Sequence, residues 1–565
     1  MLTLFRIDLT LLGGLMVLRA LPLGISSFRN LRKDDRIYVD KTDLIFSMVQ
    51  NQSRVFLARP RRFGKSLLVS TLEALFGRGL EDFQGLKIAK LWKDDKQYKV
   101  VRLDFSQISS IKLERFELNF SVHLINAFGQ FGFECEEYRL PVLLGKLSSW
   151  LSKQELGSFV LLVDEYDSPL TTSLNDNQLF TLIREDLSQF FSIIKSQDSA
   201  FQFIFITGIT KFNKTSIFSA FNNLSDISLI PEYGDIVGYR HDEVKKYFSG
   251  YIEKASKELE VDSEKLFDSL VRYYDGFCFE ETAKIKVFAP WSLLSFFTYP
   301  SRGFRDYWFE SAGQPRVLIE YLKSHNLRDP LNFTAAKSIS IAQLTGASDV
   351  ESLTDVGLLT QTGYLTIKSV SGETIFVDYP NDAVRQAMAA LYLQVLLGKT
   401  IEQAGVRNLT SILAKDNPET IVHMFDRLLE SIDYKDYAIK DEASLRALMQ
   451  VAMVGSGLSP RVESHNAHGR SDLEVTAGER YIVLELKYCG YSSTPKRLLK
   501  EAVEQMEKRR YGMQAGEKEL LRIALVFSEA ERRITEWSVV PPLKKLEDDD
   551  PNRTFLVHGT FINNF

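Results

Sequence analysis

Short apolar runs alternate with helical stretches through the first half of the chain. Strands are predicted at 54–58, 98–105, 159–163 and 201–207, and residues 66–76 have the period of a helix. The last two strands are mostly apolar, as expected for strands that are buried on both faces of a sheet. Strands that alternate with helices in this way predict a parallel sheet.

The second half of the chain has a different pattern. From about residue 239 to residue 340 it is mainly helical, with many aromatic positions. Two short strands on either side of Ser371-Gly372 predict a hairpin, and the helical pattern returns over 381–450. Residues 451–565 mix strands with helices. The chain is therefore expected to have an α/β region at each end and helical regions between them.

Composition indicates an ordinary globular protein of several domains. Hydrophobic residues make up 45% of the 565 residues and charged residues 25%. The formal net charge of −5 excludes a generally basic surface, so any nucleic-acid contact must come from local patches. The three cysteines are widely spaced and predict neither a disulfide framework nor a zinc site, which fits a cytoplasmic protein.

The sequence predicts no membrane partner. The apolar run from Leu9 to Leu18 is flanked by Asp8 and Arg19 and is too short to cross a bilayer. A signal peptide is the less favoured interpretation of this run. No other segment approaches the roughly 18 uninterrupted apolar residues that a spanning helix needs.

A phosphate-binding loop is predicted at residues 59–66, Arg-Pro-Arg-Arg-Phe-Gly-Lys-Ser, between a strand and a helix. In such loops, backbone N–H groups and the helix N-terminus bind phosphate. Gly64 and Lys65 are predicted to contact the nucleotide, with Lys65 reaching the β- and γ-phosphates, and Ser66 is predicted to ligate Mg²⁺. Arg59 stands where the general motif has its first glycine.

A second acidic motif fits the same chemistry. The strand at 159–163 leads directly into Asp164 and Glu165. Asp164 is predicted to lie beside magnesium and Glu165 to polarise the attacking water. Thr207, at the end of the next strand, is predicted to sense the γ-phosphate. The alternative is that the two acidic residues only cap the end of their strand.

Three arginines crowd the predicted phosphate loop. Arg59, Arg61 and Arg62 each have three possible roles: phosphate binding, contact with a nucleic-acid backbone, or ion pairing with carboxylates. We assign phosphate binding to one of the three, without choosing which, and solvated or paired roles to the others.

The C-terminal region carries a second candidate chemistry. Asp472 precedes an apolar strand that ends in Glu485-Leu-Lys487. Two carboxylates can hold a hard divalent cation through oxygen, and a nearby ammonium can orient water or neutralise charge on phosphate. Side chains alternate along a strand, so Glu485 and Lys487 are expected on one face. Glu463 is predicted to add a carboxylate from a preceding helix. The alternative is an exposed charged hairpin.

Several motifs together resemble the prokaryotic AAA-ATPase-like family, which is commonly fused to a C-terminal PD-(D/E)XK nuclease domain. They are Leu21-Pro-Leu-Gly-Ile-Ser-Ser-Phe28, Tyr38-Val-Asp-Lys-Thr42, residues 59–66, Asp164-Glu-Tyr-Asp167, Tyr274-Asp-Gly-Phe277, Pro380-Asn381, and Gly469-Arg470 with Asp472 and Glu485-Leu-Lys487. In this family Arg-Pro-Arg-Arg-Phe-Gly-Lys is itself the typical loop. The resemblance runs from Leu21 to about Tyr511.

The resemblance implies a fold and its domains. The expected class is α/β, with a P-loop NTPase parallel sheet, a helical lid and linker region, and a C-terminal restriction-endonuclease-like α/β domain. The expected regions are an N-terminal extension at 1–20, in which Met1 precedes the true start and Met16 is the alternative start, an ATPase core at 21–235, a lid at 236–345, a linker with winged-helix-like character at 346–450, and a nuclease-like domain at 451–565.

The resemblance also implies roles in the nuclease region. Asp472 and Glu485 are expected to hold Mg²⁺, Lys487 to position the attacking water, and Gln505 to support the site from a following helix. The Pro-Asp of the general motif is Ser471-Asp472 here, and only the carboxylate is a metal ligand.

The function expected is ATP binding and hydrolysis coupled to Mg²⁺-dependent cleavage of nucleic acid. DNA is favoured as the substrate, and a role in defence or in mobile elements follows by analogy only. The alternative is an ATP-switched nucleic-acid-binding or signalling protein with an inactive nuclease fold. ATP and Mg²⁺ are the expected cofactors. Nucleotide and nucleic acid are the expected partners, and a homo-oligomer is left open.

Overall fold

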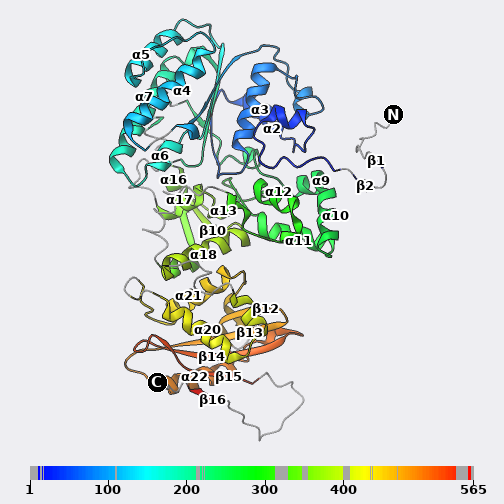
Figure 1. The fold of residues 1–565 in the computed structure, drawn as a ribbon, viewed down its shortest axis with the longest axis vertical. Coiled ribbons are helices and arrows are strands. Elements are labelled where there is room, and N and C mark those ends of the chain that lie inside the picture. Colours follow the sequence, from blue (N-terminus) through cyan, green and yellow to red (C-terminus); the bar gives the residue numbers. More distant parts are fainter. Residues whose placement is uncertain are drawn as a thin grey trace. The chain divides into compact units, whose positions relative to one another are not determined.

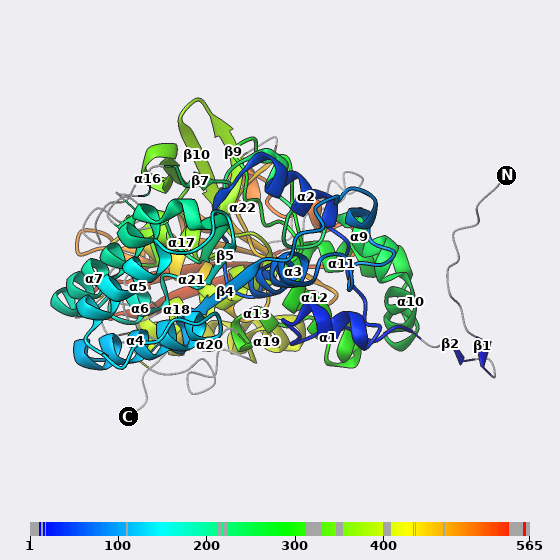
Figure 2. The same ribbon diagram turned by 90° about the horizontal axis from the view of Figure 1, so that it is seen from above.

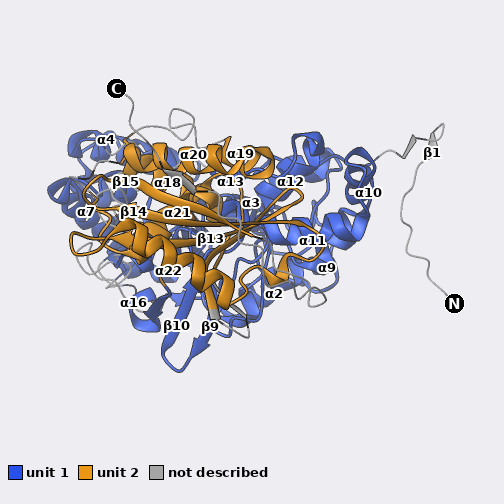
Figure 3. Ribbon diagram, turned by 90° about the horizontal axis from the view of Figure 1, so that it is seen from below, with its two compact units in different colours: residues 1–321, 336–384 blue, residues 322–335, 385–565 orange. Residues whose placement is uncertain are grey.

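A computed structural model describes residues 11–12, 15–16, 18–108, 111–211, 217–218, 221, 223–311, 329–345, 354–398, 408–432, 434, 437–466, 469–541 and 558–560. The chain divides into two compact units (Figure 3). The first unit contains residues 1–321 and 336–384, and the second contains residues 322–335 and 385–565. Each unit is described by itself.

A five-stranded parallel sheet forms the centre of the first unit (Figure 1). Its order is β4-β5-β6-β3-β7, so β6 lies between β3 and β5. The strands are β3 (Arg54–Ala58), β4 (Lys99–Asp104), β5 (Phe159–Asp164), β6 (Phe201–Gly208) and β7 (Ser225–Asp226). The four predicted strands and the parallel sheet are confirmed. β5 is buried along its whole length, which explains its uninterrupted apolar sequence.

Helices connect and cover these strands. α3 follows β3 and packs on β4 and β5, while α4 packs on β4 and on α7. The long gap between the phosphate loop and β5 contains β4, α4 and α5. The helices are α1 (Phe28–Lys33), α2 (Thr42–Asn51), α3 (Lys65–Arg78), α4 (Leu113–Gly129), α5 (Leu140–Leu151), α6 (Ser168–Thr172) and α7 (Asn177–Ser196).

The rest of the first unit is mainly helical, as predicted. Its core is rich in aromatic residues, among them the buried Phe248, Phe267 and Tyr274. A small antiparallel sheet of order β8-β10-β9 follows, and its β9–β10 hairpin stands out from the unit in Figure 2. The elements are α9 (His241–Tyr247), α10 (Ser249–Glu258), α11 (Ser263–Tyr274), α12 (Pro290–Thr298), α13 (Tyr307–Ser311), β8 (Lys337–Ser340), α16 (Ile341–Thr345), α17 (Asp355–Gln361), β9 (Thr366–Ser371) and β10 (Thr374–Asp378).

The second unit is built on a six-stranded mixed sheet of order β11-β12-β13-β14-β15-β16. β13 and β14 are parallel and are connected through α22, whereas the other neighbours are antiparallel. The strands are β11 (Arg461–Asn466), β12 (Gly469–Ala477), β13 (Arg480–Cys489), β14 (Glu519–Ser528), β15 (Arg533–Val540) and β16 (His558–Thr560).

Helices complete the second unit. α22 buries Leu499, Ala502 and Met506 in a core that also contains Val483 and Ala524 of the sheet. The helices are α15 (Pro330–Thr334), α18 (Asp382–Leu397, which begins in the first unit), α19 (Leu409–Lys415), α20 (Pro418–Glu430), α21 (Glu442–Gly455) and α22 (Pro495–Lys508). Two short strands, β1 (Leu11–Leu12) and β2 (Leu15–Met16), precede everything else.

One expectation about secondary structure is wrong. Glu463 lies in strand β11 and not in a helix that precedes the strands. The helix that does precede them is α21, which ends at Gly455. The side chain of Glu463 lies outside the described residues. Within the described residues, no helix combines the length and apolar character needed to cross a bilayer.

Candidate functional sites

The phosphate loop connects β3 to α3 and has an unusual backbone. Gly64 is the N-cap of α3 with φ 101°, a left-handed conformation that glycine adopts without steric cost. Arg62 also has a positive φ of 66°. The ammonium of Lys65 donates to the carbonyl oxygens of Arg59 and Pro60, at 3.0 Å each. Lys65 is buried, and burial lowers its pKa.

Asp164 lies at the carboxyl end of β5, close to the start of α3. It is 1% exposed, and it forms a hydrogen bond with the side chain of Ser66. Its Oδ1 atom has no hydrogen-bond partner among the described residues, and burial raises the pKa of this carboxyl. The parallel register places Asp104 of β4 beside it. A buried carboxylate oxygen next to a hydroxyl suits a hard divalent cation, so these residues fit Mg²⁺.

Glu165 follows in a strained conformation. Its φ is 51°, which is uncommon for a residue other than glycine. Burial raises the pKa of Glu165, while the nearby charges of Lys65 and Arg61 oppose that rise. The two acidic residues, the lysine and one arginine therefore gather at this end of the sheet.

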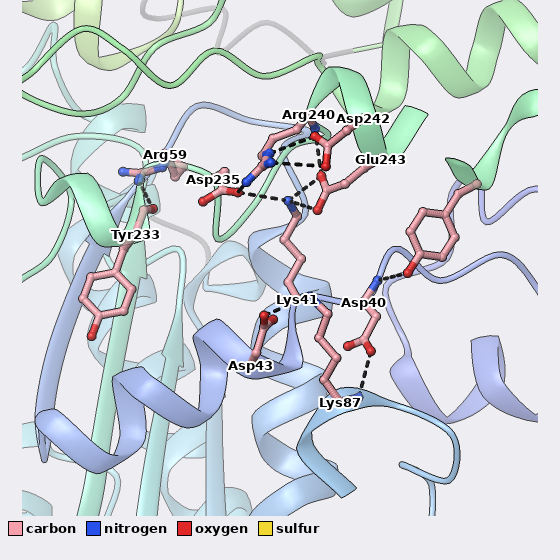
Figure 4. A network of polar contacts seen from close by, with 11 residues as sticks. Asp40, Lys41, Asp43, Arg59, Lys87, Tyr233, Asp235, Arg240, Asp242 and Glu243 are labelled. Carbon is pink, nitrogen blue, oxygen red and sulfur yellow. Dashed lines mark hydrogen bonds and ion pairs between the residues drawn. The ribbon is translucent and has the colours of Figure 1, made fainter. Parts of the chain in front are cut away.

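The three arginines of the loop have different surroundings. Arg59 is 1% exposed, and its guanidinium donates to the carbonyl oxygens of Ala58 and Ser228. It also donates to the carbonyl oxygen of Tyr233 (Figure 4). Burial lowers the pKa of Arg59 to about 10. Arg62 is exposed and stacks on Trp291 at 4.3 Å. The charge of Arg61 acts on Lys65 and Glu165, and Arg62 also interacts electrostatically with Glu165.

Thr207 and Asp167 connect the strands behind this site. The Thr207 hydroxyl is fully buried and donates to the carbonyl of Leu57 at 2.8 Å, which places it within the sheet. Asp167 is also fully buried and accepts hydrogen bonds from the backbone N–H groups of Ile209 and Thr210. Asp167 therefore fixes the chain that leaves β6 against the acidic turn that follows β5.

Residues far along the sequence hold the outer side of the loop. The indole of Trp308 donates to the carbonyl of Arg61 at 3.2 Å. A Cβ atom at Gly363 would lie 2.8 Å from the ring of Pro60, so only glycine fits here without a shift.

The segment 38–42 joins the start of the chain to the helical part of the first unit. The ammonium of Lys41 lies 2.7 Å from Glu243 and 3.8 Å from Asp235 (Figure 4). Asp40 accepts from the backbone N–H of Thr42 at 3.0 Å and of Lys87 at 2.8 Å. Lys41 and Asp40 both contact groups of other segments, so we assign these contacts a structural role.

The second site lies where β12 and β13 separate. Their last paired residues are Leu473 and Leu484, and the next residue on each side is Asp472 and Glu485. One oxygen of Asp472 accepts the backbone N–H of Leu486 at 2.8 Å. The side chain therefore takes the place that a strand carbonyl would have in a continued ladder. Both carboxylates project from this opening.

Glu485 and Lys487 form the charged centre of this site. Glu485 is 1% exposed, its Oε1 atom is 3.2 Å from the ammonium of Lys487, and its Oε2 atom has no hydrogen-bond partner among the described residues. Burial and the nearby charge of Asp472 raise the pKa of Glu485 to about 8. An orphaned carboxylate oxygen beside a second carboxylate fits a divalent cation.

Comparisons with known proteins agree with this pair of sites. Residues 22–218 match the family model described as predicted AAA-ATPase, and residues 440–537 match that of the PD-(D/E)XK nuclease superfamily. The chain joins an AAA-ATPase-like domain to a PD-(D/E)XK nuclease superfamily domain. Both predicted resemblances are confirmed.

A curated relative covers most of the chain. It is named "Uncharacterized protein in vnfD 5'region" and comes from Azotobacter chroococcum mcd 1. The two sequences are 29% identical over 482 residues, which is 83% of this chain and 89% of the relative. No solved structure matches the chain.

In the nuclease-like domain, the helix α21 supplies two charged residues that the sequence did not single out. Glu442, in its first turn, lies 3.6 Å from the ammonium of Lys487. Arg446, one turn later, lies 3.2 Å from the Oδ1 atom of Asp472. The four-residue spacing places both side chains on one face of the helix. That spacing, on the helix before the acidic strands, is the signal that identifies them.

Gln505 of α22 reaches the nuclease-like site indirectly. Its amide donates to the hydroxyl of Tyr511 at 3.1 Å, and that hydroxyl donates to the carbonyl of Arg470. Arg470 is two residues before Asp472 in β12. Gln505 therefore positions the strand that carries Asp472. In the part of the chain that the structure describes, no group of three or more metal-binding side chains is found.

Proposed function

We propose that the AAA-ATPase-like domain binds and hydrolyses ATP with Mg²⁺, and that the nuclease-like domain cleaves nucleic acid with a divalent cation, with DNA as the favoured substrate. The observation that carries the nuclease half is the pair Asp472 and Glu485. The Oε2 atom of the buried Glu485 has no hydrogen-bond partner among the described residues, and its Oε1 atom lies 3.2 Å from the ammonium of Lys487. Asp472 is the residue next to the last strand pair on the other side of the opening.

For ATP, the loop N–H groups, Lys65 and Arg61 are the proposed phosphate ligands. Ser66 and Asp164 would hold Mg²⁺, which neutralises charge on the β- and γ-phosphates. Glu165 would orient the attacking water. Arg59 and Thr207 are left out of this set, because the terminal nitrogens of the buried Arg59 donate to backbone carbonyls and the Thr207 hydroxyl donates to the carbonyl of Leu57.

A cavity beside Gly64 supports the nucleotide proposal. It is lined mainly by apolar side chains, among them Val39, Ile236, Tyr239 and Pro290. The cavity has a volume of about 70 Å³, which is less than a whole nucleobase needs, so we place only one edge of the base against these apolar side chains.

For cleavage, Asp472 and Glu485 would hold the cation, which stabilises charge on the phosphate as a Lewis acid. Lys487 would orient the water that attacks phosphorus as the P–O bond breaks. Glu442 would keep the ammonium of Lys487 in place from the other side. Glu485 must lose its proton before a cation binds, because only the carboxylate is a ligand.

One observation favours a second candidate, the ATP-switched binding or signalling protein with an inactive nuclease fold. Arg446 already lies 3.2 Å from Asp472, and Lys487 lies 3.2 Å from Glu485. Each carboxylate thus has a protein cation beside it, and such a site stays intact without metal.

The test uses the full-length protein with linear and circular DNA, and with RNA, in Mg²⁺ with and without ATP. Glu485→Gln and Lys65→Ala are the site variants, and Glu479→Gln, in the exposed turn of the same hairpin, is the control. ATP-dependent cutting that both site variants lose supports the coupled enzyme. Cutting lost only in Glu485→Gln makes the nuclease independent of the nucleotide. Binding of ATP and nucleic acid without any cutting favours the second candidate.

A further inference from the structure

A second charged cavity lies in the helical part of the AAA-ATPase-like domain. It has a volume of about 430 Å³ and is lined by Arg240, His241, Asp242, Lys284, Ile285 and Lys286. This volume is within the range of sites that hold small ligands or ligand groups. None of the lining residues belongs to the phosphate loop or to the acidic turn after β5.

Lys284 and Lys286 lie on a loop whose backbone is held by internal hydrogen bonds. Glu280 is fully buried, and its carboxylate accepts hydrogen bonds from the backbone N–H groups of Thr282 at 2.6 Å, Lys284, and Ile285 at 2.9 Å. These bonds hold the pKa of Glu280 below its ordinary value. The loop backbone is therefore fixed from within, and Lys284 and Lys286 project from a rigid support.

These two lysines form no ion pair with a described residue. Both side chains are exposed, and among the described residues no carboxylate forms an ion pair with either ammonium. Lys286 also acts on the neighbouring Lys368. Burial lowers the pKa of Lys368, and the positive charge of Lys286 lowers it further. Asp242 is the one carboxylate among the lining residues and pairs with Arg240, so the cations that line the cavity outnumber it and favour an anion.

The other basic groups that line the cavity are engaged with neighbouring carboxylates. Arg240 is engaged with Asp242 at 2.9 Å and lies 3.6 Å from Asp235, so its charge is compensated (Figure 4). The imidazole of His241 lies 2.6 Å from the buried Asp275. His241 has a donor on each ring nitrogen when it is protonated, and one of these remains for a ligand in the cavity.

We propose that this cavity binds phosphate groups through Lys284 and Lys286, as a second anion site of the AAA-ATPase-like domain, separate from the phosphate loop. The phosphate comes either from the backbone of a nucleic acid or from a free polyphosphate. Both sources offer adjacent anionic groups to adjacent ammonium groups. The site goes beyond the proposed function, because it requires neither Lys65 nor Glu485.

The test is charge reversal in the full-length protein. Lys284→Glu with Lys286→Glu is compared with Lys254→Glu with Lys257→Glu, two exposed lysines of α10 that do not line the cavity. Binding of labelled single-stranded and duplex DNA is followed by fluorescence anisotropy over a range of salt, with EDTA present so that no DNA is cut. Binding of inorganic tripolyphosphate is measured by calorimetry in a Lys65→Ala background, so that the phosphate loop does not contribute.

A nucleic-acid site predicts that the cavity variant binds DNA at least about tenfold more weakly, with a salt slope smaller by about 2, while the α10 variant is unchanged. A loss of tripolyphosphate binding alone supports the free polyphosphate as the ligand. DNA and tripolyphosphate binding that are both unchanged in the cavity variant overturn the proposal. The milder pair Lys284→Ala with Lys286→Ala repeats the test without added negative charge, and ATP binding at the phosphate loop checks that the domain is folded.

Discussion

The two candidate sites differ in what their cations contact. In the AAA-ATPase-like domain, the ammonium of Lys65 donates to two neutral carbonyl oxygens at 3.0 Å, and the Oδ1 atom of Asp164 has no hydrogen-bond partner in the described part of the chain. In the nuclease-like domain, Arg446 and Lys487 lie 3.2 Å from Asp472 and Glu485. A phosphate at the first site replaces neutral contacts. A metal ion at the second site must compete with ion pairs that already exist.

The difference teaches how strongly each site depends on its ligand. Ion pairs between partly buried groups have a large desolvation cost, which their mutual attraction must offset. The second site is therefore complete without a metal, and cation binding there is expected to need a higher concentration than nucleotide binding at the first site. Glu485, with its pKa of about 8, adds a proton to the groups that a cation must displace.

The largest effect is expected for Glu485→Gln. The change removes one of the two proposed metal-binding carboxylates, so cleavage should fall by roughly a thousandfold. Thermal stability at neutral pH should stay about equal, because the neutral amide resembles the protonated carboxyl that a pKa of about 8 favours. DNA cleavage rates and melting curves measure both effects. Glu479→Gln should leave both unchanged, and cutting that persists in Glu485→Gln would contradict the assignment.

At the first site, Lys65→Ala should weaken ATP binding by about a hundredfold. The ammonium exchanges hydrogen bonds to two neutral carbonyl oxygens for a stronger, charge-assisted contact with phosphate. Calorimetry with ATP and Mg²⁺ gives the affinity. The matched control is Arg62→Ala, an exposed residue of the same loop that should lose much less. A larger loss in Arg62→Ala than in Lys65→Ala would reverse the roles that we propose.

The comparison is sharpened by Arg446→Met, which keeps most of the side-chain volume. Removing the guanidinium from Asp472 should raise the affinity of the nuclease-like site for a divalent cation by about tenfold, or about 1.4 kcal/mol. Calorimetry with Mn²⁺ tests this in the Lys65→Ala background. Arg497→Met, which breaks an exposed pair with Glu501, is the control. A weaker affinity in Arg446→Met means that the arginine positions Asp472 for the metal.

The smallest effect concerns Asp186 of α7, an acidic residue outside both sites. Burial and the charges of Glu117 and Glu185 raise its pKa to about 7. The folded protein therefore holds a proton there that the unfolded chain releases at lower pH. This contribution to stability is complete below about pH 4 and is lost as pH rises through 7. Asp186→Asn should remove this pH-dependent loss of folding stability, which amounts to roughly 1 kcal/mol after allowance for partial exposure.

Melting temperatures at pH 5 and pH 8 test the prediction for Asp186. The wild type should be relatively less stable at the higher pH, and the variant should lose this difference. An unchanged difference would show that Asp186 does not hold the proton. Asp186 lies outside both candidate sites, so the result shows whether a carboxyl group away from a proposed ligand site also has a raised pKa.

The sequence predicted the sheets well because their signals are local. β3, β5 and β6 were predicted to within about one residue, since runs buried on both faces contain few polar positions. The β9–β10 hairpin followed from Ser371-Gly372, and Asp472 and Glu485 came from the acidic positions that flank one apolar strand. In these cases the pattern of a few neighbouring residues is sufficient.

The remaining features depend on tertiary structure. Glu463 and Glu442 are both acidic residues before the apolar strand, and only the fold shows that Glu442 lies beside Lys487. Arg59, Arg61 and Arg62 share one residue type within four positions, yet the first is buried and the last is exposed. The backbone at Arg62 has a positive φ, which directs this residue differently from Arg59. No local sequence pattern predicts this turn.

The contacts around the phosphate loop also make it visible to optical spectroscopy. Two of the five tryptophans adjoin it: Trp308 through its indole N–H on the carbonyl of Arg61, and Trp291 beneath the guanidinium of Arg62 at 4.3 Å. Indole emission responds to hydrogen bonding and to nearby charge. A ligand that moves either arginine therefore changes the intrinsic fluorescence of the unlabelled protein, and a Trp308→Phe variant assigns the part of the signal that comes from the carbonyl contact.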